Sequence, residues 1–405
     1  MNISALYLVR IQLSLFQMSF IARRLPLFRS AFLLLALFLF FGYRATAQEL
    51  QLNALSSLKY LNTFVLPHNL QFKKTTVGGL SSIDFDPKTN TYYLICDDRS
   101  HRNPARFYTA KIDLSAIGIT NVKLTQTFPL KQADGSTYPE KAVKGSKTSD
   151  PEAMRYNPIN NTLMWTSEGA RIVNTRDTIL IDPAINVITP SGKFVDAIPL
   201  PDNLKMQAIE RGPRENGVLE GLTFADNFKS IYISLEEPLY QDGPRADLFR
   251  NKAFVRIYKI ELESKKNTAQ YAYELEPIAF PPVKPGDSKN NGIPDILSIG
   301  HNKLLVTERS FGAGRVGANI KVFVAELTDR ENIMGINSLK ETPVIRPVQK
   351  KLLLNMDDLS IFTDNVEGAT IGPKLPNGHQ TLIFVTDNNF NAKEQTQFLV
   401  FEVIP

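Results

Sequence analysis

The carboxylates of this sequence recur at matched positions in five copies of one pattern. Each copy has a short turn with an acid or a glycine, an apolar strand, a tight turn, and a second strand that ends in carboxylates. The copies start at Gly78, Glu152, Glu220, Asp295 and Glu367, and successive starts lie 74, 68, 75 and 72 residues apart. A period of this size that contains strands predicts a radial array of sheets.

The spacing within each copy brings two sets of acids to one place. The start of the first strand and the end of the second lie at the same edge of an antiparallel pair. If the first strand of each sheet is innermost, that edge forms one rim of a central channel. The strand starts then bring Glu152, Glu220, Asp295 and Glu367 to the rim, and the second-strand ends bring Asp98, Glu168, Glu236, Glu308 and Asp387.

Such crowding predicts a bound cation. Neighbouring carboxylates repel by about 1 kcal/mol or more at partly screened distances, and a hard cation removes this repulsion. Calcium accepts six to eight oxygen ligands in loose geometry, whereas zinc prefers histidine or thiolate. The chain has only four histidines, so we expect Ca²⁺. The alternative is that these acids are turn or cap residues on solvated loops.

The strongest metal candidates are Glu152, Glu220 and Glu367, because each is followed by Ala or Gly, which permits close backbone approach. We also expect Glu152 and Glu220 to take part in catalysis. Gly78 stands where the other copies have an acid, which would leave one coordination position open for a substrate.

Two arginines and one histidine complete the candidate site. Arg99 and Arg309 occupy matched positions after Asp98 and Glu308. The planar guanidinium suits phosphate or carboxylate, so these arginines could hold an anionic substrate, or they could pair with neighbouring acids as structural ties. His101 lies near the same rim and is a weaker candidate for proton transfer.

The elements that must position these residues are strands. Alternating β-branched and aromatic residues between turns outline four strands in each period, for example 80–85, 91–96, 106–114 and 122–130 in the first copy. The fifth copy supplies only three strands, and residues 58–67 resemble the missing fourth one. We therefore predict an all-β propeller of five four-stranded blades, in which the N-terminal strand closes the last blade and removes an exposed edge.

Two other folds match the pattern less well. Six blades are possible if residues 169–219 contain additional strands. A β-sandwich with repeated turns explains neither the period nor the match between the chain's two ends.

The first 47 residues resemble an export signal. Arginines precede an apolar run at 31–41, which is closed by Ala45-Thr46-Ala47, and the run is shorter than the roughly 20 residues that span a bilayer. We expect cleavage after Ala47, a true start at Met18, and a single domain at 48–405 without a transmembrane anchor. The protein would then be periplasmic or extracellular.

Removing this segment changes the charge balance. It carries five arginines and no acid, so 41 basic and 41 acidic residues remain, and nothing supports binding to nucleic acid. The single cysteine, Cys96, excludes a disulfide within the chain and is expected in the core.

Several short motifs together resemble a known family. They are Gly78-Gly79-Leu80-Ser81, Asp150-Pro151-Glu152-Ala153, Glu220-Gly221-Leu222, Asn291-Gly292-Ile293-Pro294-Asp295 and Asn365-Val366-Glu367-Gly368. The set resembles the secreted phytase-like domain family, described as having esterase-like activity of phytase. The resemblance covers roughly 76–403 and implies a propeller that hydrolyses phosphoesters or related esters. The Asp-Asp-Pro-Ala-x-Trp segment of alkaline propeller phytases is not intact here, and Asp150-Pro151-Glu152-Ala153 is only a partial match.

These observations favour an exported, calcium-dependent hydrolase of small anionic esters, which we expect to be a monomer. A rim-bound ion would polarise the ester and activate water. Two alternatives stay open: a noncatalytic ligand-binding propeller of the cell envelope, and a calcium-dependent lactonase.

Overall fold

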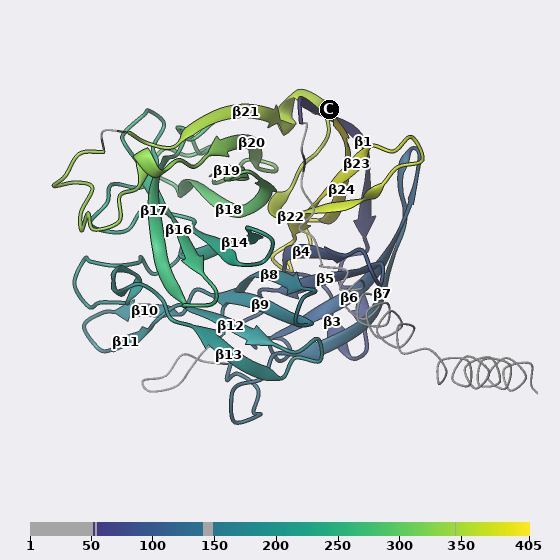
Figure 1. The fold of residues 1–405 in the computed structure, drawn as a ribbon, viewed down its shortest axis with the longest axis horizontal. Helices are drawn as coiled ribbons and strands as arrows, with labels where there is room; N and C mark the ends of the chain where they lie inside the picture. Colours follow the sequence, from purple (N-terminus) through teal and green to yellow (C-terminus); the bar gives the residue numbers. More distant parts are fainter. Residues whose placement is uncertain (1–51, 53–54, 141–148, 345) are drawn as a thin grey trace, which may run out of the picture. The chain divides into compact units, whose positions relative to one another are not determined.

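The described part of the chain is built almost entirely from antiparallel sheets. The computed structural model describes residues 52, 55–140, 149–344 and 346–405, so the predicted export signal at 1–47 lies outside the described residues. In Figure 1 five four-stranded sheets surround a common centre, as expected for a propeller. The predicted five blades are thereby confirmed.

Each blade runs from an innermost to an outermost strand. Blade 1 has β4 (Leu80–Asp86), β5 (Thr91–Cys96), β6 (Arg106–Ser115) and β7 (Gly118–Pro129). Blade 2 has β8 (Pro151–Asn157), β9 (Thr162–Ser167), β12 (Ala184–Ile188) and β13 (Phe194–Ile198). Blade 3 has β14 (Leu219–Ala225), β15 (Ser230–Leu235), β16 (Phe254–Glu261) and β17 (Lys266–Glu274). Blade 4 has β18 (Lys289–Gly300), β19 (Lys303–Gly312), β20 (Asn319–Glu326) and β21 (Gln349–Asn355). Blade 5 has β22 (Asn365–Lys374), β23 (Gln380–Asp387), β24 (Thr396–Ile404) and β1 (Ser57–Leu66).

The ring closes as predicted. β1 pairs antiparallel with β24, with Ser57 opposite Ile404 and Leu66 opposite Thr396. Both ends of the described chain therefore lie in one sheet, in which the outermost strand comes from the N-terminal side. This pairing covers an edge of β24 that would otherwise present unpaired backbone groups.

The long second period contains a hairpin rather than a sixth blade. β10 (Ala170–Val173) and β11 (Thr178–Ile181) pair only with each other, between the second and third strands of blade 2. A smaller hairpin, β2 (Gln71–Phe72) with β3 (Thr75–Thr76), precedes blade 1. The described residues also form three short 3₁₀ helices, η1 (Asp202–Leu204), η2 (Asp329–Glu331) and η3 (Met356–Leu359).

The hydrophobic core lies between neighbouring blades. Successive side chains of a strand point to opposite faces, so each sheet contributes to two interfaces. In β5, Leu94 packs in the cluster shared with blade 5, whereas Ile95 packs with Trp165 of blade 2. Cys96 is buried and unpaired in the same strand, and the predicted core position of its thiol is confirmed.

An ion pair at the centre ties the five innermost strands together. The guanidinium of Arg155 in β8 donates to the backbone oxygens of Leu222 and Ile83, each at 2.7 Å, and to both carboxylate oxygens of Asp295 at 2.8 Å. Asp295 also accepts from the backbone N–H of Ala369 at 2.8 Å. These five residues belong to five different innermost strands, so we call Arg155 and Asp295 the axial pair.

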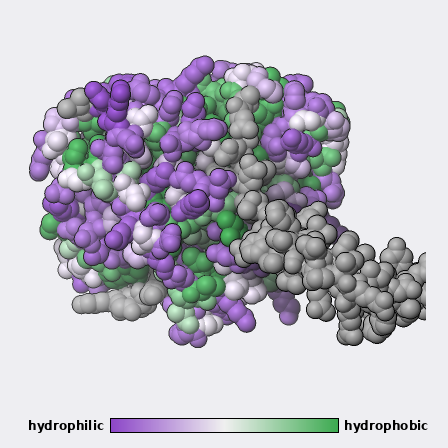
Figure 2. All heavy atoms as spheres, viewed as in Figure 1, coloured by the Kyte–Doolittle hydropathy of each residue, from purple (hydrophilic) through white to green (hydrophobic). Residues whose placement is uncertain are grey.

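Hydrophilic residues dominate the face shown in Figure 2, with hydrophobic residues in small separate groups. Within the described part of the chain, no helical segment has the length and hydropathy needed to traverse a bilayer.

Candidate functional site

β-Bulges near the start of the innermost strands direct acids into one pocket. The pairing of β14 with β15 shifts between Leu219 and Gly221, which leaves Glu220 as the extra residue. In β22, the shift between Val366 and Gly368 leaves Glu367 in the same way. A bulge bends the strand and changes the direction of the extra side chain, so both glutamates leave the sheet face and enter the pocket.

The second blade has a wider bulge with the same result. The pairing of β8 with β9 shifts between Pro151 and Met154, and Glu152 lies within the shift. Glu152 lines the same pocket as Glu220 and Glu367. The three strongest metal candidates of the sequence thus come together from three separate blades.

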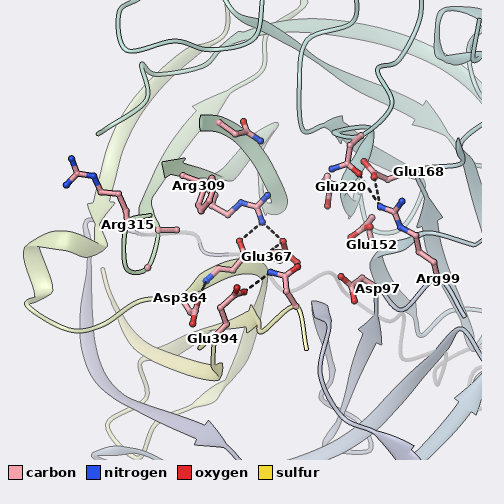
Figure 3. Close-up of a pocket in the computed structure, with 17 residues that line it drawn as sticks. Asp97, Arg99, Glu152, Glu168, Glu220, Arg309, Arg315, Asp364, Glu367 and Glu394 are labelled. Carbon is pink, nitrogen blue, oxygen red and sulfur yellow. Dashed lines mark hydrogen bonds and ion pairs between the residues drawn. The ribbon is translucent and has the colours of Figure 1, made fainter. Parts of the chain in front are cut away.

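The pocket is strongly acidic and has a volume of about 400 Å³ (Figure 3). Among the described residues, its wall contains three arginines and seven carboxylates, the latter being Asp97, Glu152, Glu168, Glu220, Asp364, Glu367 and Glu394. The acids therefore outnumber the cations that could neutralise them.

The tightest group of acids lies at one side of the pocket, where Glu152 and Glu168 line the wall and Asp150 is not among the lining residues. Asp150, Glu152 and Glu168 each place a carboxylate oxygen within 4.8 Å of the others, and all three are buried. Calcium binds oxygens at about 2.3 to 2.6 Å, so two ligands on opposite sides of one ion lie about 4.6 to 5.2 Å apart. The spacing of this group, which we call the acid triad, fits a shared hard cation.

Arg99 covers the acid triad from the solvent side. Its Nε lies 2.5 Å from Asp150 Oδ1, and a terminal nitrogen lies 3.9 Å from Glu168 Oε2 and 3.1 Å from Asn216 Oδ1. Figure 3 shows this arginine beside Glu168, Glu152 and Asp97. The Arg99 side chain is 44% exposed, so it can leave the triad without breaking core packing.

Arg309 occupies the other side of the pocket and is fully engaged. It bridges Glu236, at 2.7 Å, and Glu367, and it donates to Asn365 at 2.6 Å. Only 15% of its side chain is exposed. Its contacts match the structural-tie interpretation of the sequence, while those of Arg99 leave room for a ligand.

Burial and mutual repulsion raise the pKa values of the pocket acids. Desolvation is the largest cause at Glu152 and Glu220, whose pKa values are raised well above the ordinary range, and the neighbouring carboxylates add to it. The same two causes raise the pKa of Asp150 well above its usual value. For Asp97, burial and the Glu367 charge raise the pKa to about 7, against the opposing effect of Arg99.

The first blade presents Asp97 to the pocket, not the predicted Asp98. Asp98 is turned away and accepts from the backbone N–H groups of His101 and Asn103 at 2.8 and 2.9 Å, and from Arg106 at 2.7 Å. Adjacent residues of an extended chain point in opposite directions, so a shift of one residue exchanges their surroundings. His101 is exposed and is not among the pocket residues.

A glycine creates the space for Asp97. Gly79 has φ of +59°, and a Cβ at this position would overlap the Asp97 carboxylate. The second glycine of the Gly78-Gly79 motif therefore makes room for the carboxylate. The bulge of this blade lies between Leu80 and Ser82, so Ser81, rather than Gly78, is the counterpart of Glu220.

The fourth blade differs from the predicted pattern in the same region. Its bulge lies between Gly292 and Asp295, so Asp295 follows the bulge and reaches the axial pair instead of the pocket. Glu308 accepts from Tyr273 Oη and Asn291 Nδ2 at 2.8 Å, and from Lys350 Nζ at 2.6 Å. Both acids are thus held by their own partners outside the pocket.

Glu236 and Asp387 lie behind the pocket wall. Glu236 is buried against Arg309 and also accepts from Asn290 Nδ2 at 3.3 Å. Asp387 is buried, and desolvation together with the charges of Asp97 and Glu367 raises its pKa well above the usual value. Both acids shape the electrostatic potential of the pocket without lining it.

Four acids of this region are not among the candidates taken from the sequence: Asp97, Asp364 and Glu394 line the pocket, and Asp150 belongs to the acid triad. Asp97 lies beside the chosen Asp98, and Asp150 stands two residues before Glu152 in one of the family motifs. Both were visible as acids within recurring motifs. A motif does not specify the direction of a side chain, and this direction decides which of two neighbouring acids, such as Asp97 and Asp98, faces the pocket.

The fold and this pocket define an all-β propeller with an acidic, partly buried site near the starts of its innermost strands. The sequence matches the family model "Phytase-like: esterase-like activity of phytase" over residues 75–390. The chain therefore belongs to the phytase-like family, and the predicted resemblance is confirmed. No curated protein matches the sequence significantly.

Distant similarities to solved structures accompany this assignment. An exo-β-1,3-galactanase from Phanerochaete chrysosporium is 11% identical with a TM-score of 0.43, and the alignment covers 85% of this chain and 65% of the galactanase. An endo-1,4-β-xylanase from Bacteroides thetaiotaomicron is 12% identical with a TM-score of 0.40 and coverages of 85% and 91%. A gluconolactonase from Xanthomonas campestris is 9% identical with a TM-score of 0.33 and coverages of 87% and 100%. Similarities this distant carry no argument about activity.

Proposed function

We propose that this protein is a divalent-cation-dependent hydrolase of ester bonds, with calcium as the ion and small anionic esters, phosphoesters first, as substrates. The observation that carries the proposal is the acid triad of Asp150, Glu152 and Glu168, whose oxygens lie within 4.8 Å of one another. Membership of a family described by esterase-like activity supports the reaction class.

The donor set fits a hard cation better than a soft one. The triad offers carboxylate oxygens only, and the nearby wall adds Glu220 and Asp97. Carboxylate ligands suit calcium or magnesium, and buried acids with raised pKa values gain most from a bound positive charge. A bound divalent cation would polarise the ester oxygen and lower the pKa of a coordinated water.

Other residues of the chain would bind the substrate and position the acids. Arg99 is half exposed and stands over the triad, so it is placed to hold the anionic group of a substrate. Arg309 is engaged by Glu236 and Glu367 and would keep those acids in position. Glu220 stands on the same wall and would complete the surroundings of the ion.

Metal binding and turnover should be measured on the same preparation. Calorimetry on chelator-treated protein gives the calcium affinity, and phosphomonoesters, phosphodiesters and lactones give the reaction class. We expect Glu152→Gln to weaken calcium binding at least about ten-fold, since even outer-shell groups contribute that much. We expect turnover to fall with it.

A matched control tests whether the effect is local. Glu402→Gln changes a glutamate that pairs with His379 and Lys59 on the outer side of blade 5 and should leave calcium binding and turnover unchanged. Turnover that persists in chelator would reject the metal-dependent mechanism. Calcium binding without turnover of any ester would favour the noncatalytic binding propeller, and turnover of lactones alone would favour the lactonase.

We also propose that residues 1–47 direct export and that the mature chain is residues 48–405. Mass spectrometry of the protein recovered from the periplasm or culture medium tests this cleavage. An intact N-terminus in the exported protein would contradict it.

A further inference from the structure

A second groove continues directly from the acidic pocket. It has a volume of about 290 Å³ and shares Phe311, Arg315, Gly317 and Ala318 with the pocket wall. Its own wall adds Phe280 and Val316 on an apolar side, and Ser310, Asn319 and Asp357 on a polar side. The side chains of Phe280, Phe311 and Val316 are 47%, 42% and 90% exposed. Three large apolar side chains therefore meet water next to the candidate site.

Two segments of the chain form this groove, and hydrogen bonds join them. Val283 donates its backbone N–H to the Ala313 oxygen at 2.9 Å, which joins the segment after Phe280 to the β19–β20 loop. Arg315 Nε donates to the Pro281 oxygen at 3.0 Å, and its guanidinium lies over the Phe280 ring at 5.4 Å from the centroid. The apolar side chains are thus positioned by specific contacts.

Arg315 contacts residues of the groove rather than the acids of the pocket. Figure 3 shows its guanidinium pointing away from Glu220 and Glu152. Gly317, on the same loop, has φ of +72°, and a Cβ there would lie 2.6 Å from the Thr363 oxygen. The loop therefore has a defined path between the pocket and the groove.

The charge of the pocket argues against a substrate with many anionic groups. Among the described wall residues seven are acids and three are arginines, and Glu236 and Glu367 already neutralise Arg309. The wall therefore offers few cationic groups to a polyphosphate, whose many anionic groups would each need a partner. A ligand with one anionic group and one apolar group matches both halves of the surface.

We propose that the substrates are amphiphilic esters, with the ester and its anionic group in the acidic pocket and an alkyl chain or aromatic ring against Phe280, Phe311 and Val316 in the groove. This inference rests on the proposed function for the reaction, while the binding of amphiphilic anions can be tested without turnover. The groove then determines specificity and is not part of the catalytic machinery.

Alkylphosphonates provide a non-hydrolysable probe. Methyl-, butyl- and octylphosphonate are titrated into the calcium-loaded full-length protein, below the concentration at which octylphosphonate aggregates. We expect the affinity to rise about two- to four-fold for each methylene that the groove buries. Phe280→Ser and Val316→Ser, which change residues that line only the groove, should flatten this dependence while the affinity for methylphosphonate stays the same.

Ile117→Ser is the matched control for Val316→Ser. Ile117 is an aliphatic residue of the β6–β7 turn and is 77% exposed, at the opposite end of its blade from Cys96. This variant should keep the dependence on chain length. Equal affinities for the three phosphonates, no binding of any of them, or tighter binding of inositol hexakisphosphate than of octylphosphonate would overturn the inference.

The two proposals fail in different ways. Hydrolysis of esters without dependence on chain length would retain the proposed function and reject the amphiphilic substrate. Binding that depends on chain length without hydrolysis of any ester would support the amphiphilic ligand and reject the hydrolase.

Discussion

Two groups of buried charge lie at the centre of this propeller, and they are built in opposite ways. In the axial pair, Arg155 and Asp295 satisfy each other and also bond to the backbone of the other innermost strands. In the acidic pocket, carboxylates outnumber the arginines among the described wall residues. The contrast separates a group that is satisfied within the fold from one whose charge is left in excess.

The difference follows from the cost of burying charge. A buried charge is tolerated when it is paired and hydrogen-bonded, and an unpaired one destabilises the protein by several kcal/mol. The axial pair meets this condition without a ligand. Burial and neighbouring carboxylates raise the pKa values of Glu152 and Glu220, so these acids meet the condition by taking up protons or by binding a cation.

The largest effect should come from breaking the axial pair. Arg155→Met leaves Asp295 buried without its counter-charge, so we expect a loss of about 3 to 5 kcal/mol in the free energy of unfolding. Urea denaturation followed by circular dichroism measures this loss. Arg315→Met, on the exposed loop, is the control and should change stability by less than about 0.5 kcal/mol. Equal losses for the two variants would contradict the structural role of the axial pair.

A variant of the pocket should change the free energy of unfolding in the opposite direction. Glu220→Gln removes one of the repelling acids, so without metal near pH 8 it should stabilise the protein, because burial and the neighbouring carboxylates disfavour the charged form of Glu220. The same variant should bind calcium more weakly. Glu308→Gln gives the contrast, because Glu308 is also buried but accepts from Tyr273, Asn291 and Lys350. That variant should be destabilised, and stabilisation of both would mean that the two acids do not differ.

A pH dependence of the stability is also expected in the absence of metal. Burial and the Glu367 charge raise the pKa of Asp97 from an unfolded value of about 4 to about 7. The folded protein therefore binds more protons than the unfolded one between these values, and stability falls as pH rises from about 4 to about 7. Denaturation midpoints measured in chelator across this range should decrease, and Asp97→Asn should reduce the slope. A slope that is unchanged in this variant would assign the titration to other acids.

Much of the fold could be predicted because its signals are local and repeated. The period, the turn sequences and the resemblance of residues 58–67 to a fourth strand predicted five blades and the closure by β1. Of the site residues, Glu152, Glu220 and Glu367 could be found because each adjoins a small residue that accommodates a bulge. They meet in the pocket as a direct result.

The positions of other residues could not be predicted from the sequence, because they depend on the register of the strand pairs. Asp97 and Asp98 are chemically alike, and only the direction of the chain at Gly79 decides which one enters the pocket. Asp295 looks like the strand-start acid of the fourth blade, but it follows the bulge and therefore reaches Arg155.

The sequence alone predicted the repeat, the ring closure and the acids at the ends of strands. These features depend on residue type and on spacing along the chain. Which of those acids share a pocket, and which are neutralised by arginine, became clear only in three dimensions. That outcome depends on bulges and on contacts between blades, where a shift of one residue moves a carboxylate from a satisfied position into an acidic one.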